Sequence, residues 1–307
     1  MKERTRGNIA LLITAVVWGS GFVAQRLGNE ILPPMAFNSI RQIMAGIVLC
    51  PVLALDLSRS GYMSASSNTE SQLRYKRRKL ITAGIVCGCF MTFGSMMQQI
   101  GLVTVSAGKS GFISSIYIVF VPLFSVILGV RVRKRSVFCI AMAMAGFAVM
   151  SLRGGFDTIT TGDWLTLLSA AGFAAQIVAV NHFVDKGNAI FLSVLQMFFC
   201  GIVGFMLSVF IEHPAPEAFI ACLPILLYTT FVPTAMGYTF QIVGQKYTDS
   251  STAALIMSLE AVFAAIFGML CLHEIMSLRE VAGAAIIFAA TIIGQMEDPK
   301  AISSPEP

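Results

Sequence analysis

The chain has 307 residues, of which 56% are hydrophobic and only 12% are charged, and its mean hydropathy is +0.79. Soluble domains usually carry about 25% charged residues, so this composition excludes an ordinary soluble domain and predicts a polytopic membrane protein. The net charge of +5 is then expected to report on membrane topology, and we expect no nucleic-acid partner.

Ten apolar runs follow one another along the chain, each roughly 17 to 25 residues long and therefore able to cross a bilayer. The first run follows Lys2, Arg4 and Arg6 and resembles a signal peptide, but it lacks a small-residue cleavage site, so we expect a retained helix. A polar loop at 58–79 and a disordered cytoplasmic tail at 297–307 complete the layout. The sequence thus predicts an all-α membrane protein with ten transmembrane helices at 8–27, 34–55, 80–103, 106–129, 135–152, 162–183, 189–211, 217–243, 250–271 and 278–295.

The basic residues give the expected orientation. If the N-terminus is cytoplasmic, 16 of the 21 Lys and Arg residues fall on the cytoplasmic side, four fall outside, and Arg41 lies within the second run. This bias follows the positive-inside rule and predicts a multi-pass inner-membrane protein with both termini in the cytoplasm. The basic cluster at 74–79 is also compatible with binding of anionic lipid head groups, although topology alone explains it.

An internal repeat divides the ten runs into two sets of five. At an offset of 155 residues the first two runs align with the sixth and seventh, and at an offset of 143 the third and fourth align with the eighth and ninth. The pairs include Gly7 with Gly162, Leu12 with Leu167, Gly46 with Gly201, Gly94 with Gly237, Gln98 with Gln241 and Tyr117 with Glu260. Because five is odd, the second set enters from the opposite side, which predicts two inverted five-helix repeats at 1–154 and 155–296. Secondary transporters are typically built this way, with the substrate site near the midplane between the repeats.

Four segments carry a resemblance to a known family: AVVWGSGFVAQR (15–26), PPMAFNSIR (33–41), SAGKSGFISSIYIVFVPLFS (106–125) and ALIMSLEAVFAAIFG (254–268). They resemble the EamA family of the drug/metabolite transporter superfamily. The resemblance implies a ten-helix inner-membrane carrier, often an exporter of amino acids or other small metabolites, whose cavity is lined by helices 1, 3, 4, 6, 8 and 9. The family's ninth-helix motif commonly reads SLEPVFA, whereas this chain has Ala261 in place of the proline, which argues against a helix break beside Glu260.

Glu260 is the first candidate site residue. It lies near the middle of the ninth run, where a carboxylate is costly and usually faces a cavity or a partner. There it is suited to bind a cationic group or to carry a proton; the alternative is a neutral glutamic acid that fixes helix packing. Tyr117 is its partner under the repeat, so we expect the two to face each other, unless Tyr117 is simply a buried tyrosine with a satisfied hydroxyl.

The other expected cavity residues are Trp18, which is too deep for an interfacial belt, together with Gln98, Tyr238 and Gln241. Core packing is the alternative for each of them. Arg41 is suited to attract anions near the outer mouth, but our preferred interpretation is an anchor that snorkels outward, and we expect Lys109 at the interface.

The predicted function is that of a secondary active transporter, not an enzyme, which moves small organic metabolites, such as amino acids, by alternating access. A flippase of lipids or lipid-linked metabolites is the alternative. A membrane-embedded enzyme is more distant, because Ser20 lacks a nearby base to activate it. The expected partners are a small-molecule substrate, the bilayer and protons, in a monomer or homodimer whose Gly84 and Gly88 face packs within or between chains. Neither a metal nor a cofactor is expected, since the seven cysteines lack metal-ligand spacing.

Overall fold

The computed structural model describes residues 2–60, 69–129, 134–151, 159–184 and 189–295, and every regular element in these ranges is helical. The elements are α1 (Lys2–Asn29), α2 (Pro34–Ser60), α3 (Glu70–Gly101), α4 (Ala107–Ser114), α5 (Tyr117–Ser125), the 3-10 helix η1 (Val126–Leu128), α6 (Lys134–Ser151), α7 (Thr161–Phe183), α8 (Ala189–Ile211), α9 (Pro216–Ala221), α10 (Leu223–Thr229), the π-helical η3 (Thr230–Met236), α11 (Gly237–Gln245), α12 (Ser250–Met257), α13 (Glu260–Leu272) and α14 (Leu278–Gln295).

Seven helical stretches in the described ranges are long and apolar enough to cross a membrane. They are Glu3–Asn29, Pro34–Ser58, Glu70–Gly101, Ala107–Leu128, Thr161–Phe183, Ala189–Ile211 and Ser250–Leu272. The other three expected spans fall on α6, on the interrupted series from α9 to α11, and on α14. The protein is therefore a polytopic, all-helical membrane protein, and the number of ten crossings stays a prediction.

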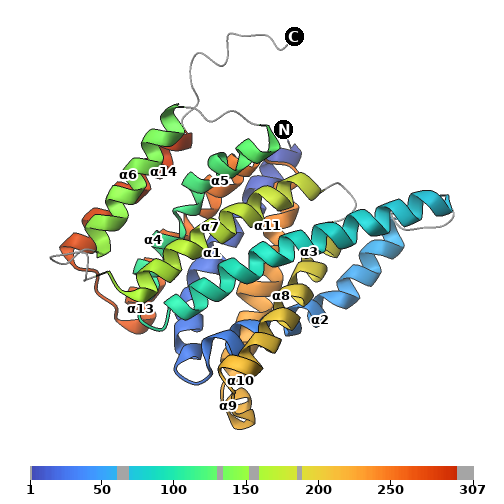
Figure 1. Cartoon of the computed structure of the whole chain (residues 1–307), viewed down its shortest axis with the longest axis horizontal. Helices are drawn as coiled ribbons and strands as arrows, with labels where there is room; N and C mark the ends of the chain where they lie inside the picture. Colours follow the sequence, from blue (N-terminus) through green and yellow to red (C-terminus); the bar gives the residue numbers. More distant parts are fainter. Residues whose placement is uncertain (1, 61–68, 130–133, 152–158, 185–188, 296–307) are drawn as a thin grey trace.

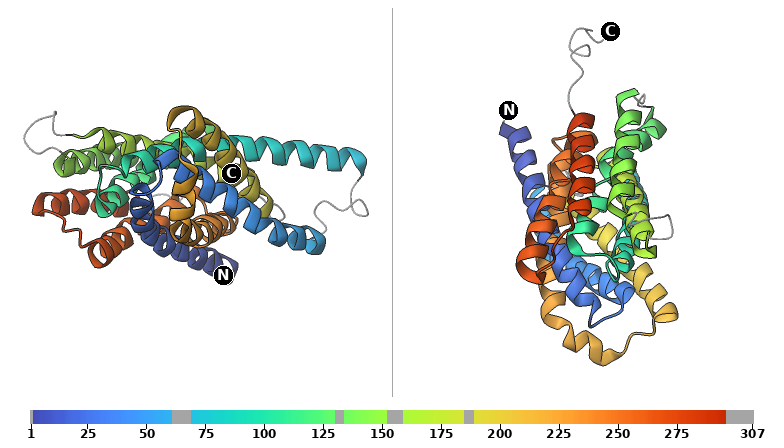
Figure 2. Two further views of the ribbon diagram at one scale, coloured as in Figure 1. Left: turned by 90° about the horizontal axis from the view of Figure 1, so that it is seen from below. Right: turned by 90° about the vertical axis from the view of Figure 1, so that its left-hand side faces the viewer.

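The helices form one bundle in which α1 contacts many of the others (Figure 1). It packs against α13 and α11, while α7 packs against α3, α4 and α5. Two long pairs, α2 with α8 and α6 with α14, lie on opposite flanks of this centre. Figure 2 shows that α1 begins and α14 ends at the same end of the bundle.

The expected polar loop at 58–79 is shorter in the structure, because α3 begins at Glu70. Thr69 and Gln72 form a capping box that satisfies the first backbone N–H groups of the helix. An i,i+4 ion pair of 3.0 Å between Glu70 and Arg74 supports the first turns. Local capping thus extends the helix into a segment whose polarity alone suggests a loop, and α2 and α3 project beyond the bundle there (Figure 1).

Glycines allow close approach between α3 and α8. A Cβ atom added to Gly84 would lie 2.6 Å from Cβ of Leu195, and one added to Gly88 would lie 2.7 Å from Cβ of Phe199. Real Cβ atoms do not approach so closely, so both positions require glycine for this packing. The small-residue face of α3 is therefore used inside the bundle and not between two chains.

Two expected spans are interrupted near their middles, at matching positions. Between α4 and α5, and again between α12 and α13, the backbone makes i→i−3 hydrogen bonds, as from Ala261 N to Ser258 O at 3.1 Å. The hydroxyls of Ser115 and Ser258 each donate to the carbonyl three residues earlier, at 2.7 Å. Such back-bonding competes with the helix ladder and bends helices, so the break needs no proline. The expectation that Ala261 disfavours a break beside Glu260 is wrong.

A third interruption lies in the π-helical segment η3, which contains Pro233. Proline has no N–H to donate to the preceding turn, so the helix widens there and frees backbone carbonyl groups. The carbonyl of Pro233 accepts a hydrogen bond of 3.0 Å from Nε1 of Trp18. The interruption therefore places a polar backbone atom at the centre of the bundle.

Candidate functional site

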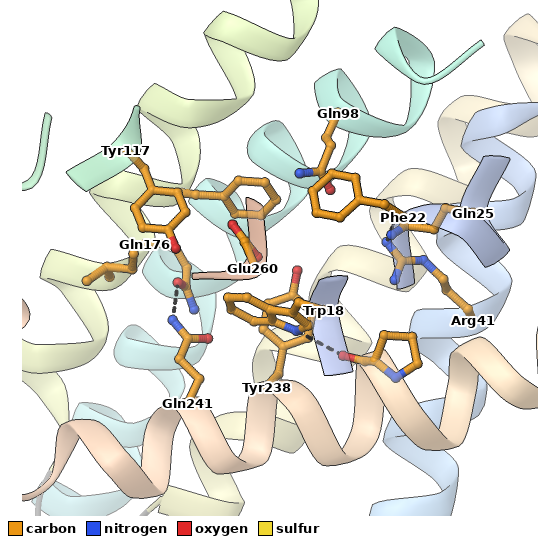
Figure 3. Close-up of a pocket in the computed structure, with 13 residues that line it drawn as sticks. Trp18, Phe22, Gln25, Arg41, Gln98, Tyr117, Gln176, Tyr238, Gln241 and Glu260 are labelled. Carbon is orange, nitrogen blue, oxygen red and sulfur yellow. Dashed lines mark hydrogen bonds between the residues drawn. The ribbon is translucent and has the colours of Figure 1, made fainter. Parts of the chain in front are cut away.

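A cavity lies between the interrupted helices and the continuous helices α1, α2, α3 and α7 (Figure 3). Its aromatic and apolar wall consists of Trp18, Phe22, Tyr117, Phe173, Ile177, Pro233 and Tyr238, and its polar groups belong to Gln25, Arg41, Gln98, Gln176, Gln241 and Glu260. The space between the lining atoms is about 450 Å³, but the centre of a water molecule fits into only about 30 Å³ of it. That is room for about two water molecules. The lining side chains therefore leave little free space in this conformation.

Glu260 and Tyr117 enter the cavity from the two helix breaks. Tyr117 is the first residue of α5 and Glu260 the first residue of α13, and both side chains are buried. The Tyr117 hydroxyl points toward Glu260 in the cavity and has no hydrogen-bond partner among the described residues (Figure 3). Within the described ranges Glu260 forms no ion pair. The structure thus holds an unpaired carboxylate against the cavity.

Trp18 forms one wall of the cavity and is held in a fixed orientation. Its indole N–H donates to Pro233, and its ring meets the ring of Tyr238 edge-on, with centroids 5.0 Å apart. A Cβ atom added to Gly237 would lie 2.6 Å from Nε1 of Trp18, so the α11 backbone lies directly against the indole. Aromatic pairs of this kind bury a large apolar surface and restrict ring motion.

Glutamine side chains line the opposite part of the cavity. Nε2 of Gln241 donates to Oε1 of Gln176 at 2.9 Å (Figure 3). Nε2 of Gln176 in turn donates to Oε1 of Gln196 at 3.0 Å. Gln98 donates to the hydroxyl of Ser114 at 2.9 Å. The hydrogen bonds from Gln241 to Gln176 and from Gln176 to Gln196 fix the orientation of the Gln176 and Gln241 amides. Oε1 of Gln241 is buried without a donor from the described residues. That oxygen is able to accept a hydrogen bond from a bound ligand.

Arg41 lies in the cavity wall and does not snorkel outward, so the preferred interpretation from the sequence is wrong. Its side chain is buried, with 3% of the residue surface exposed. Its guanidinium donates to Oε1 of Gln25 at 3.0 Å, to Oδ1 of Asn38 at 2.7 Å and to Oγ1 of Thr234 at 3.1 Å. These acceptors come from α1, α2 and η3, and together they hold the charge inside the bundle.

Lys109 is also more deeply buried than expected at an interface. Its Nζ lies 2.7 Å from Oδ1 of Asp163, and the side chains are 9% and 0% exposed. Nearby, Nε of Arg26 lies 3.4 Å from Oε1 of Glu274, whose carboxylate accepts from the first N–H groups of α4. These two ion pairs tie together α1, α4, α7 and the segment after α13 at the end of the bundle where α1 finishes.

The six side chains named from the sequence, Trp18, Gln98, Tyr117, Tyr238, Gln241 and Glu260, all line this one cavity. Their role in substrate binding stays a prediction. The sequence interpretation missed Phe22, Phe173 and Ile177. The repeat would have found Phe173, because an offset of 155 pairs it with Trp18, whereas Phe22 and Ile177 pair only with each other. Gln25 and Pro233 carried no such signal.

Taken together, the fold and the cavity define a polytopic helical membrane protein with a closed, mixed polar and aromatic chamber among its broken helices. Within the described ranges there is no cluster of three or more His, Cys, Asp or Glu residues suited to a metal ion. This combination is typical of membrane carriers, in which discontinuous helices form the binding site.

Comparisons with known proteins agree with this class. The sequence model of the EamA-like transporter family matches residues 5–152 and 160–294. An uncharacterized transporter of Archaeoglobus fulgidus is 30% identical over 95% of this chain and 86% of its own. A probable terminal-alkyne amino-acid exporter of Streptantibioticus cattleyicolor is 27% identical over 80% of this chain and 79% of its own. One solved crystal structure has a TM-score of 0.63 over 94% of this chain and 97% of its own, at 16% identity, and so shares the fold.

The chain belongs to the EamA-like transporter family, and it is a multi-pass membrane transporter. An inner membrane transporter of Escherichia coli, YedA, is 27% identical over 54% of this chain and 50% of its own.

Proposed function

We propose that this protein is a secondary active transporter that moves small organic metabolites bearing an amino group across the cell membrane by alternating access. The observation that carries the proposal is the unpaired Glu260 carboxylate in a chamber otherwise walled by aromatic and amide side chains. A buried carboxylate without a cationic partner favours a cationic ligand or a proton, and Glu260 is suited to both. The amino-acid exporter among the relatives supports export of an amino acid or a related compound.

The proposal includes two inverted repeats, at 1–154 and 155–296, whose boundary lies outside the described residues. Several equivalences support it. The helix breaks before Tyr117 and Glu260 are 143 residues apart, and so are the back-bonded Ser115 and Ser258. Contacts also correspond, because α1 packs against α13 and α11 while α7 packs against α5 and α3. The tail at 297–307 also lies outside the described residues.

Alternating access requires the chamber to open at one end of the bundle at a time. In the present conformation both ends are closed by contacts around α1 and α7. Arg26 donates to the carbonyl of Val105 at 2.8 Å at one end, and Asn181 donates to the carbonyl of Thr248 at 3.2 Å at the other. Under the two offsets Arg26 corresponds to Asn181 and Val105 to Thr248. The two closures thus have a common geometry, as expected for a carrier whose halves rock about a central site.

Reconstitution tests the proposal directly. We expect proteoliposomes loaded with unlabelled L-amino acids to take up a labelled amino acid by counterflow, while protein-free liposomes do not. The same vesicles containing a fluorescent phospholipid distinguish a flippase. If the protein moved the phospholipid between leaflets and moved none of the standard amino acids or their amines, the proposed function would be wrong.

Orientation gives a separate prediction. With the N-terminus in the cytoplasm, Ser71 before the basic cluster is cytoplasmic, and Ser277 at the start of α14 is outside; both are exposed. In a cysteine-free background, we expect a membrane-impermeant maleimide to label Ser277→Cys in intact cells and Ser71→Cys only after the membrane is opened. Labelling of Ser71→Cys in intact cells would reverse the topology.

A further inference from the structure

The chamber contains a second unpaired charge, and it is positive. The three side chains that accept hydrogen bonds from Arg41 are an amide of Gln25, an amide of Asn38 and a hydroxyl of Thr234, all of them neutral. No described carboxylate lies within ion-pair distance of Arg41. Its Nε atom is buried and has no acceptor among the described residues. Buried charges are normally paired, so a guanidinium with an open N–H beside a cavity is set up for an anionic ligand.

The repeat indicates that the fold does not require this charge. At an offset of 155 the counterpart of Arg41 is Gln196, a neutral side chain that is also buried. At an offset of 143 the counterpart of Glu260 is Tyr117, which is likewise neutral. Each charge therefore occurs in one half only, at a position where the other half packs with an uncharged residue. A purely structural role would not explain both differences.

We propose that Arg41 binds the carboxylate of the transported solute while Glu260 binds its ammonium group, so that the substrate class is a zwitterion with an apolar side chain. This inference rests on the proposed function and names the ligand chemistry of the same cavity. Arg41 has a planar fork of N–H donors that matches a carboxylate, and its Nε is free for one of the bonds. The rings of Trp18 and Phe22 provide an apolar surface for the side chain.

The opposite charges of Glu260 and Arg41 favour a zwitterion over a ligand that carries only an amine or only a carboxylate. A plain amine would neutralise Glu260 and leave Arg41 unpaired in the closed chamber, and a plain carboxylate would do the reverse. Only a ligand with both charges pairs both residues when water is excluded, because an unpaired buried charge of either sign is unfavourable. A zwitterion should therefore stabilise the protein more than either simpler ligand.

The test measures ligand-induced thermal stabilisation of the full-length protein in detergent. The probes are the standard L-amino acids and, for each one that stabilises, its carboxamide and its decarboxylated amine. We expect the wild type to bind the amino acid roughly tenfold to a hundredfold more tightly than the carboxamide, the range expected for losing a charge-assisted hydrogen bond. Arg41→Gln installs the amide found at Gln196, and we expect it to bind both probes equally and weakly.

Two further variants keep the result interpretable. Arg41→Lys keeps the positive charge but lacks the planar N–H donors of the guanidinium, so it should keep part of the preference for the amino acid over its carboxamide. It tests the inference if Arg41→Gln does not fold. Arg74→Gln is the matched control, since Arg74 is exposed on α3 and should leave binding unchanged. The inference is overturned if Arg41→Gln keeps the wild-type preference, or if amines stabilise the wild type and no amino acid does.

Counterflow of the stabilising amino acid separates this inference from the proposed function. Uptake without discrimination between the acid and its carboxamide would reject the Arg41 site and leave a transporter. Arg41-dependent binding without any uptake would support the site and reject transport.

Discussion

Glu260→Gln is expected to lower counterflow of the substrate by roughly 30-fold or more. Truncating one partner of a buried, hydrogen-bonded charge pair costs about 2–5 kcal/mol, and 1.4 kcal/mol corresponds to a factor of ten in affinity. Glutamine has nearly the same shape as glutamate, so the break between α12 and α13 should persist. Because the carboxylate has no ion-pair partner among the described residues, its loss should not lower the melting temperature.

Two variants give this experiment its controls. Tyr117→Phe removes the hydroxyl at the repeat-equivalent position and should reduce counterflow much less, because it removes no charge. Glu70→Gln removes an exposed carboxylate on α3 and should have no effect on transport. The assignment would be wrong if Glu260→Gln transported normally with an unchanged dependence on pH. If it bound the substrate normally but no longer responded to a proton gradient, Glu260 would carry the proton and not the substrate amine.

The sequence predicted which side chains line the cavity better than it predicted where the helices begin, end or break. Seven of the predicted apolar runs fall on helices long enough to cross a membrane, and Tyr117 and Glu260, which the offset of 143 pairs, both line the cavity. The high cost of burying a carboxylate in a membrane helix predicted that Glu260 faces a cavity. The predictions of helices and of Glu260 needed no tertiary contacts, because each rests on a local property, either hydrophobic length or the desolvation of one group.

Three features could not be predicted from the sequence, because each depends on which hydrogen bonds particular side chains form in the folded chain. The burial of Arg41 follows from acceptors on three different elements, with Gln25 and Thr234 brought to it by the fold. The break before Glu260 follows from the rotamer of Ser258, which donates to its own helix and so replaces the missing proline. The start of α3 at Glu70 depends on the hydrogen bonds of a capping box, which outweigh the polarity of the segment.

Lys109→Met is expected to destabilise the protein by about 3–5 kcal/mol, because it leaves the buried carboxylate of Asp163 without its partner. The two side chains join the first turns of α4 and α7, and Oδ2 of Asp163 also accepts the N–H of Thr160 at 3.1 Å. Adding Asp163→Asn should recover most of the loss, since the amide oxygen retains this cap without a charge. Unfolding of the purified single and double variants measures the effect. Lys79→Met, at an exposed lysine of α3, is the control and should change stability by less than about 0.5 kcal/mol.

The Lys109–Asp163 ion pair should make one end of the bundle harder to open than the other. Under the offsets, Asp163 corresponds to Asn8 and Lys109 to Thr252, and Asn8 accepts only a neutral hydrogen bond of 3.2 Å from Thr248. Glu274 and Arg26 add a second ion pair at the end held by Lys109. Under the proposed alternating access, opening that end separates ion pairs that have no counterpart among the described residues of the other end, so the double variant Lys109→Met/Asp163→Asn should open it more often. A thiol introduced at Val105, which is buried there, should then react faster than in the charged protein. An unchanged rate would show that the ion pair stabilises the fold without controlling access.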